Sequence, residues 1–283
     1  MLEERIGEAL GGEVVRTAPL TGGCIAQVSW AKLADGREVV VKADPGPAPR
    51  LSIEGYMLDY LARHSSLPVP RVHHSADDLL IMDFLPGDST FSAQAQIHAA
   101  DLLADLHDVS APTFGLERDT LIGALDLPNP QTETSWLDFF RAWRLIYPAR
   151  VSVERGRMGR DLLARVERFG HDLERWLDEP DAPALVHGDV WTTNVLAQGD
   201  RITGFLDPAI YFGHGEMDLA YIALFSSFGQ PFFQRYNERR PIAPGFFETR
   251  RHIYALYPLL VHVWHFGGGY PDRVSSVLDS FGY

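Results

Sequence analysis

Hydrophobic and polar positions alternate along the first part of the chain in the manner of β-strands. The run 25–30 alternates after a pair of glycines, and the apolar run 39–41 follows the dipeptide Asp35-Gly36. Such a dipeptide between two strand-like runs is typical of a β-hairpin turn. A further strand pair, ending in the apolar run 79–84, is predicted to complete an antiparallel sheet.

The pattern changes to helical spacing after a proline-containing loop at 44–49. Ile53, Met57, Leu58 and Leu61 recur at intervals of three and four residues, which places them on one face of a helix. The sequence therefore predicts one helix packed on the N-terminal sheet.

Helical spacing dominates the second part of the chain, beyond a break at 85–88. Predicted helices cover 97–107, 135–146 and 160–177, and short predicted strands cover 185–187, 195–197 and 202–207. The sequence therefore predicts an α+β protein of two lobes. We expect a strand-rich N-terminal lobe with one helix at residues 1–85, and a helix-rich C-terminal lobe at residues 86–283.

Composition narrows the class of protein. The 283 residues include 46% hydrophobic residues, which excludes global disorder. With 38 acidic and 25 basic side chains, the formal net charge is −13, which argues against a nucleic-acid partner but not against a small phosphorylated ligand. No targeting segment or membrane span is expected, and a single cysteine, Cys24, fits a reducing compartment, so the protein is expected in the cytoplasm.

The densest chemical signal lies among the short strands of the second lobe. Asn194 comes five residues after Asp189 in the run that begins at His187, and Asp207 comes thirteen residues after Asn194. Carboxylate and amide oxygens suit Mg²⁺, which completes its shell with water and substrate phosphates. A carboxylate beside such a site can accept the proton of an attacking hydroxyl. The competing interpretation is that these residues only form turns, where Asp and Asn are common.

A second candidate group lies in the first lobe. Gly22, Gly23 and Cys24 are predicted to form a bend whose backbone N–H groups approach phosphate oxygens. Lys42 ends an apolar strand, and Glu54 lies on the following helix, in a position to pair with it. In an isolated hairpin these two would be an edge-strand lysine and a surface glutamate. Together with the downstream carboxylates, they are better explained as a clamp for ATP phosphates.

The sequence resembles the fructosamine kinase (ketosamine-3-kinase) family. This family belongs to the small-molecule branch of the protein-kinase-like fold, which also includes aminoglycoside phosphotransferases and choline kinases. The resemblance rests on the segments 21–25, 187–194 and 206–220, and parts of the intervening chain share it. Its discriminating features are the Asp-Pro-Ala that begins at Asp207, in place of Asp-Phe-Gly, and the position of Trp191.

The resemblance implies transfer of the γ-phosphoryl group of ATP to the 3-hydroxyl of a ketosamine, and hence deglycation of metabolites or proteins. It implies that Asp189 is the catalytic base and that Asn194 and Asp207 hold Mg²⁺. Lys42 would contact the α- and β-phosphates and would be oriented by Glu54. The adenine would be received by the connector between the lobes: Met82, Asp83, Phe84 and Leu85.

Five further residues near these motifs are candidates. Trp191 could stack on the sugar or only form a wall of the site, and Arg144 and Glu216 could face the substrate. His187 is expected to support the catalytic loop, and Asp218 is expected to accept backbone N–H groups of that loop.

Cys24 carries a hypothesis of its own. Neighbouring N–H groups and Lys42 would favour its thiolate, so that oxidation would block ATP binding or link two chains. The alternative is that the bend simply requires a small residue. The chain is otherwise expected to be a monomer that acts on a small-molecule ketosamine or a glycated protein.

Two rival functions remain open. The same fold could carry an aminoglycoside- or choline-type phosphotransferase, or a non-catalytic, nucleotide-binding pseudokinase. A degenerate site would usually lack at least one functional side chain, whereas this chain retains the full set: Lys42, Glu54, Asp189, Asn194 and Asp207.

Overall fold

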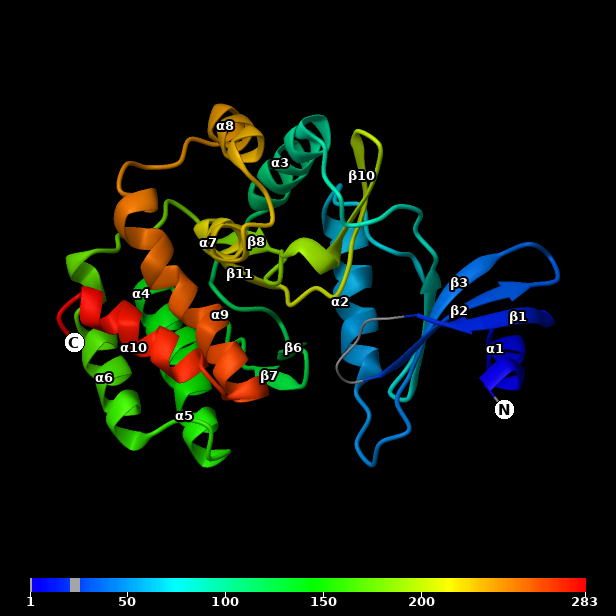
Figure 1. Ribbon diagram of the computed structural model, residues 1–283, viewed down its shortest axis with the longest axis horizontal. Coiled ribbons are helices and arrows are strands. Elements are labelled where there is room, and N and C mark those ends of the chain that lie inside the picture. Colours follow the sequence, from blue (N-terminus) through cyan, green and yellow to red (C-terminus); the bar gives the residue numbers. More distant parts are fainter. Residues whose placement is uncertain (1, 21–25) are drawn as a thin grey trace.

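The N-terminal part of the chain contains a five-stranded antiparallel sheet in the order β1-β2-β3-β5-β4. The computed structural model describes residues 2–20 and 26–283 (Figure 1). The strands of this sheet are β1 (Val14–Pro19), β2 (Gln27–Leu33), β3 (Glu38–Ala43), β4 (Val72–Ala76) and β5 (Leu79–Asp83). Strands β2 and β3 form the predicted hairpin, and Gly36 takes up the left-handed conformation of the turn with φ +91°.

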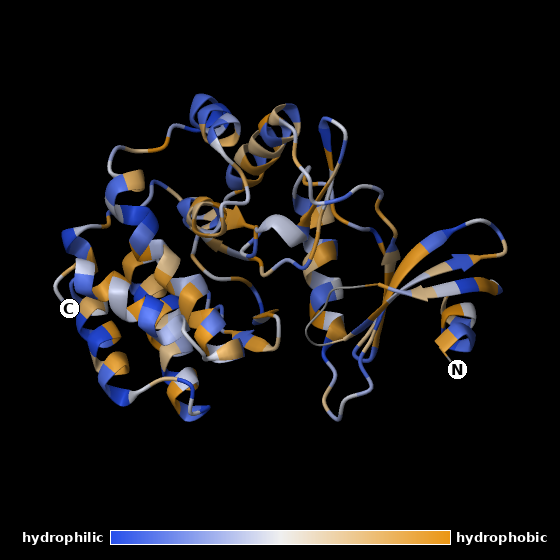
Figure 2. Cartoon of the chain, viewed as in Figure 1, coloured by the Kyte–Doolittle hydropathy of each residue, from blue (hydrophilic) through white to orange (hydrophobic). Residues whose placement is uncertain are grey.

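Two helices cover opposite faces of the sheet: α1 (Leu2–Leu10) and α2 (Leu51–His64). Successive side chains of a strand point to opposite faces. Val39 and Val41 therefore pack with α1, whereas Val40 packs on the face that α2 covers. The central strands β3 and β5 carry mostly apolar colours in Figure 2. Lys42 shares the face of Val40, so its side chain points toward α2.

Helices make up most of the remaining chain, which lies to the left of the sheet in Figure 1. The α-helices are α3 (Ala93–His107), α4 (Trp136–Phe139), α5 (Tyr147–Glu154), α6 (Arg160–His171), α7 (Glu216–Phe225), α8 (Gln230–Arg239), α9 (Arg251–Phe266) and α10 (Tyr270–Ser280). Among the described residues, Phe140–Ile146 and Phe246–Arg250 are π-helical, and Leu173–Arg175 and Thr192–Asn194 are 3₁₀-helical.

Three small antiparallel strand pairs lie among these helices. They are β6 (Thr120–Ile122) with β7 (Leu125–Leu127), β8 (Ala184–Val186) with β11 (Tyr211–Gly213), and β9 (Val195–Gln198) with β10 (Arg201–Phe205). Helix α7 is buried on nearly all sides and packs against α9. The pairs β8–β11 and β9–β10 and helix α7 position the candidate catalytic residues.

The observed architecture confirms the predicted α+β, two-lobed fold, but the N-terminal lobe has two helices, α1 and α2, where one was predicted. The predicted helix 135–146 is a short α-helix that continues as a π-helix, and the predicted helix 160–177 ends at His171. The β6–β7 hairpin was not predicted, because its strands are too short to show a period. The boundary between residues 85 and 86 stays a prediction. Within the described ranges, none of the helices combines the length and apolarity that a bilayer span requires.

Candidate active site

A cavity of about 330 Å³ lies between the sheet lobe and the helical lobe. The sheet lobe contributes side chains from β2, β3 and α2, and the helical lobe contributes side chains from the loops after β8 and β10 and from α7 and α9. The predicted site residues that line it are Lys42, Glu54, Asp189, Trp191, Asn194 and Asp207. The structure thus brings residues 165 positions apart in the chain into one space.

Lys42 contacts two carboxylates, one in its own lobe and one in the helical lobe. Its Nζ donates to Glu54 Oε1 at 2.7 Å and also contacts Asp207. Burial opposes the charge of this lysine, but Asp207 and Glu54 outweigh that effect and raise the pKa of Lys42 above its usual value. Burial raises the pKa of Glu54 to about 7, against the opposing effect of Lys42. The ammonium is therefore charged and held in a fixed position at neutral pH.

The catalytic loop begins where β8 ends. Gly188 has φ +83°, and a Cβ atom there would lie 2.2 Å from the carbonyl oxygen of Ala209, so only glycine fits. Asp218 Oδ2 and Oδ1 accept the backbone N–H groups of His187 and Gly188, each at 2.8 Å. The backbone of the loop is thus fixed from α7, and the side chain of Asp189 reaches the cavity.

Asp189 is held by Asn194 from within the same loop. Asn194 Nδ2 donates to Asp189 Oδ2 at 2.8 Å and to the backbone oxygen of Asp189 at 3.1 Å. Burial raises the pKa of Asp189 to about 7, outweighing the effects of Tyr221 and Asn194, which lower it. A carboxyl group with this pKa can take up a proton near neutral pH, as a general base must.

Asp207 follows β10 and takes a left-handed backbone conformation, with φ +50°. The N–H of Leu206 donates to the backbone oxygen of Asn194 at 2.8 Å, which places the two predicted metal ligands side by side. Burial opposes the charge of Asp207, but Lys42 outweighs it and keeps the pKa of this carboxyl below its usual value. Asp207 therefore presents an ionised carboxylate to the cavity.

The side chains of Asn194 and Asp207 offer the oxygen atoms that a magnesium ion requires. Asn194 commits its amide nitrogen to Asp189, so its carbonyl oxygen is the atom that a cation would meet. Mg²⁺ usually takes one or two protein oxygens and fills its shell with water and phosphate oxygens. In the part of the chain that the structure describes, no group of three or more His, Cys, Asp or Glu side chains could hold a metal ion. The donor set suits an ion that arrives with a nucleotide.

The catalytic loop is supported by a buried hydrogen-bond network, of which the sequence predicted only a part. Asp218 was expected to accept N–H groups of the loop, but its second partner was missed. His107 Nε2 lies 3.1 Å from Asp218 Oδ2, and His107 Nδ1 lies 2.6 Å from the hydroxyl of Tyr236. Burial lowers the pKa of His187 to about 4, so this imidazole is neutral and its Nδ1 accepts the N–H of Asp189 at 3.3 Å.

Two residues that were predicted to face the substrate, Arg144 and Glu216, do not line the cavity. Arg144 is fully buried and does not line the cavity. Its guanidinium donates to Asn129 and stacks over the ring of Tyr211 at 3.9 Å, so it packs the helical core. Glu216 is also buried and pairs with Arg250 at 2.6 Å and 2.8 Å, away from the cavity lining. The expectation that these two side chains face the substrate does not agree with their positions.

The remaining predictions concern the nucleotide. Gly22, Gly23 and Cys24 lie outside the described residues, so the bend and the Cys24 hypothesis stay predictions. The connector Met82, Asp83, Phe84 and Leu85 does not line the cavity, although Phe84 is 40% exposed. Its predicted contact with adenine is untested.

Several cavity residues were not predicted from the sequence. Tyr221 on α7 lies among apolar residues on a helix buried all round, so no pattern marks it. The segment 121–124 reaches the cavity from the unpredicted hairpin, and His262, His265 and Phe266 reach it from the end of α9. His265 Nε2 lies 3.0 Å from the carbonyl oxygen of Ile122, so α9 contacts this hairpin directly.

Comparison with known proteins identifies the family of the chain. The profile of the fructosamine kinase family matches residues 2–281. The chain belongs to the fructosamine kinase family. It is 34% identical over 269 residues to a probable ketoamine kinase of Synechocystis, covering 92% of this chain and 88% of that protein. It is 28% identical over 291 residues to the chloroplastic protein-ribulosamine 3-kinase of Arabidopsis thaliana, covering 97% and 85%. The chain is therefore a phosphotransferase.

Solved structures agree with this family assignment. A fructosamine-3-kinase candidate from Thermobifida fusca superposes with a TM-score of 0.87 at 33% identity, covering 99% of this chain and 97% of that one. An aminoglycoside phosphotransferase, crystallised with ADP and hygromycin B, gives a TM-score of 0.69 at 20% identity, covering 100% and 99%. The second similarity shows that the fold is protein-kinase-like.

Proposed function

We propose that this chain is an ATP- and Mg²⁺-dependent kinase that phosphorylates the 3-hydroxyl of ketosamines, and that its role is deglycation. The observation that carries the proposal is the meeting of Lys42, Asp189, Asn194 and Asp207 around one cavity, in a chain of the fructosamine kinase family. This is the set of side chains that positions a triphosphate opposite a base.

Asp189 would act on the acceptor. Its carboxylate would accept the proton of the attacking hydroxyl as the bond to the γ-phosphorus forms and the bond to the β–γ bridging oxygen breaks. The hydrogen bond from Asn194 holds the carboxylate in place before the acceptor arrives. Because the loop backbone is anchored on Asp218, little reorganisation is needed during the reaction.

Lys42 and the ligand pair would act on the nucleotide. Lys42 would contact the α- and β-phosphates, oriented by Glu54 at 2.7 Å. Asn194 and Asp207 would hold Mg²⁺, which neutralises phosphate charge when it is bound. Since Lys42 contacts Asp207 directly in this structure, nucleotide binding would separate the two side chains.

Trp191 would form the acceptor side of the site. It lines the cavity two residues beyond Asp189, and its ring lies 5.8 Å from that of Phe225. An aromatic face of this kind suits the C–H surface of a sugar, which supports a carbohydrate adduct as the acceptor.

A substrate panel tests the proposal. ADP release would be measured with a ribulosamine, a fructosamine, an aminoglycoside and choline as acceptors, with and without Mg²⁺. We expect Mg²⁺-dependent turnover with the ketosamines only. Turnover that is confined to the aminoglycoside or choline would replace the proposed substrate class, and nucleotide binding without turnover on any acceptor would favour a pseudokinase.

A further inference from the structure

Phe266, the last residue of α9, lies at the rim of the cavity. It lines the cavity and is nevertheless 55% exposed. Among the described residues, the other exposed large apolar side chains are Val15, Phe84 and Phe247, and none of these three lines the cavity. A single exposed apolar residue is normal on a protein surface. This one differs from the others because it stands where the site opens to solvent.

A row of aromatic rings connects Phe266 to the catalytic loop. The ring of Phe266 lies 5.6 Å from that of His262, which lies 5.2 Å from that of Phe225. Phe225 lies 5.8 Å from Trp191, which follows two residues after Asp189. Trp191, His262 and Phe266 line the cavity, and the fourth ring supports them from α7. The wall that leads from the proposed base to solvent is therefore aromatic.

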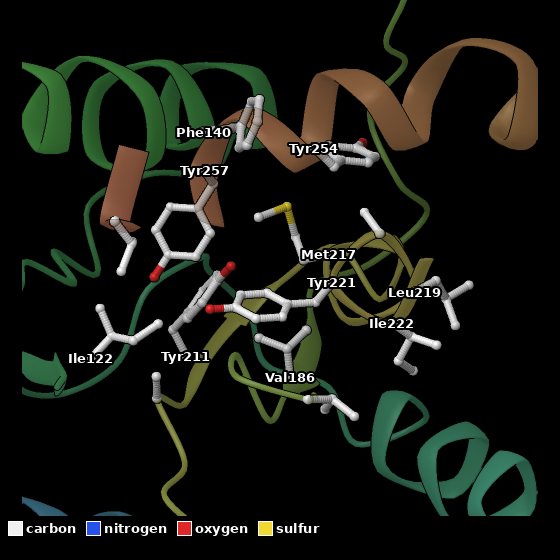
Figure 3. Packing of buried hydrophobic residues seen from close by; sticks show 14 of the residues in the cluster. Ile122, Phe140, Val186, Tyr211, Met217, Leu219, Tyr221, Ile222, Tyr254 and Tyr257 are labelled. Atoms are coloured by element: carbon white, nitrogen blue, oxygen red, sulfur yellow. The ribbon is translucent and has the colours of Figure 1, made fainter. Parts of the chain in front are cut away.

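The position of Phe266 is fixed by the way α9 ends and packs. Arg157 Nη1 donates to the carbonyl oxygen of Trp264 at 2.8 Å and also contacts that of His265, so the free carbonyls of the last turn are paired. Helix α9 packs against α7, and Figure 3 shows buried side chains from the two helices in one region of the core: Met217, Tyr221, Tyr254 and Tyr257. The rim is thus formed by the end of a well-anchored helix.

The shape of a ketosamine matches this row. The molecule consists of a sugar and an amine carrier, the group that is attached to the amine nitrogen. The 3-hydroxyl of the sugar has to meet Asp189, at the inner end of the row, because the proton is taken up there. The amine is joined to C1, two carbons from the reacting position, so the carrier extends from the sugar toward the rim. Phe266 is the ring that it meets there.

We infer that Phe266 is a specificity-determining residue for the amine carrier, and that it selects ketosamines whose carrier is an apolar chain or ring. Contact with the phenyl ring removes apolar surface of both partners from water, which favours binding. A hydroxylated carrier loses hydration at the same place and gains no hydrogen bond from a phenyl ring. The inference rests on the proposed function and adds to it the chemical class of the carrier.

The test uses two ketosamines that share one sugar and carry hexylamine or 2-(2-aminoethoxy)ethanol, chains of equal length that differ in polarity. KM and kcat are measured for each adduct by ADP release at saturating MgATP. Wild type should show a KM about fivefold lower for the hexylamine adduct. Phe266→Ala should remove this preference by raising the KM for the hexylamine adduct alone. We expect kcat on both adducts to stay at the wild-type value, because Phe266 does not touch the reacting hydroxyl.

Two further variants provide the controls. Phe266→Tyr keeps a ring at the rim and should keep the wild-type preference. Phe247→Ala removes a ring that is 40% exposed but does not line the cavity, so it should leave both KM values unchanged. Thermal unfolding confirms that each variant is folded. Should Phe266→Ala not fold, Phe266→Gln, which lacks the apolar ring, is measured in the same way.

Four results would overturn the inference. Wild type could show equal KM values for the two adducts, Phe266→Ala could retain the preference, or Phe247→Ala could lose it as well. A fall in kcat with unchanged KM in Phe266→Ala would place the residue in the reaction step instead of carrier selection. Failure of the proposed function gives a different result: wild type then phosphorylates neither adduct, and the inference falls with it. Turnover by wild type with an unchanged preference in Phe266→Ala refutes the inference alone.

Discussion

Asp218 holds Gly188 from a different part of the fold: Oδ1 of the aspartate accepts the glycine N–H at 2.8 Å. The same carboxylate accepts the N–H of His187 at 2.8 Å and contacts His107 at 3.1 Å. Helix α7 and helix α3 thereby fix the backbone from which Asp189 projects. The geometry of the base depends on a buried residue that does not line the cavity.

Asp218→Asn is predicted to weaken both the fold and the reaction. An amide in place of the carboxylate turns an N–H donor toward the loop, so at least one buried N–H loses its acceptor. We expect a loss of about 3 kcal/mol in the free energy of unfolding, measured in urea. The exposed ion pair of Asp279 with Arg165 gives a control, since Asp279→Asn should cost less than about 1 kcal/mol. Equal losses for the two variants would show that Asp218 does not anchor the loop.

Gly188→Ala is predicted to be far more damaging than Gly199→Ala. Both glycines have a positive φ, +83° and +60°, so each alanine carries backbone strain of about 1–2 kcal/mol. Only at Gly188 does the added Cβ meet a backbone oxygen, 2.2 Å away at Ala209, whereas nothing lies within 4 Å at Gly199. We expect Gly188→Ala to lose about 1–3 kcal/mol more in thermal or urea unfolding, together with its activity. Similar stability of the two variants would argue against this close contact.

The reaction is predicted to fail at acidic pH because of Asp189. Burial raises the pKa of this carboxyl from 3.8 to about 7. A base works only when it is deprotonated, so activity is present above this pKa and is lost as the pH falls through it. We expect kcat/KM for the acceptor, measured at saturating MgATP, to decline on the acid side well above pH 3.8. A profile that stays flat down to pH 5 in the folded enzyme would remove Asp189 from the role of base.

Glu54→Gln is predicted to act on the nucleotide and not on the acceptor. The glutamate orients Lys42 at 2.7 Å, and the neutral amide would hold the ammonium less firmly. We expect the KM for ATP to rise about tenfold, with the KM for the acceptor unchanged. The matched comparison is Asp189→Asn, which should lower kcat by about 10² or more and leave ATP affinity intact. A rise in the KM for the acceptor alone in Glu54→Gln would contradict the phosphate role of Lys42.

Asp207→Ala is predicted to abolish the dependence of nucleotide binding on Mg²⁺. Wild type should bind ATP more tightly with Mg²⁺ than with EDTA in a titration of nucleotide affinity. The variant lacks the carboxylate that faces the cavity, so its affinity should be the same in both conditions. Retention of the Mg²⁺ effect in Asp207→Ala would assign the metal to other ligands.

The sequence predicts those parts of the site that depend on local pattern. Lys42 and Glu54 follow from strand alternation and helix spacing, and the loop from Asp189 to Asn194 is a contiguous motif. Contacts between distant elements could not be predicted in this way. His107 lies 111 residues before Asp218, and nothing in either local pattern pairs them.

Arg144 shows how a sequence can mislead. Its charge, among aromatic residues at helical spacing, suggested a side chain in the cleft, but the guanidinium stacks on Tyr211 and donates to Asn129 within the core. Arginine can be buried where aromatic faces and amide oxygens surround it. Only the packing of three separate segments, those of Arg144, Tyr211 and Asn129, reveals those partners.

The most direct test of this account is the phosphorylation of a synthetic ketosamine by wild type and by Asp189→Asn. The two proteins would be compared at equal MgATP concentration, with ADP release and the mass of the product as the readouts. We predict a product one phosphoryl group heavier with wild type, and a rate lower by about 10² or more with Asp189→Asn, which still binds ATP. Equal rates for the two proteins, or an unmodified ketosamine after ATP is consumed, would contradict it.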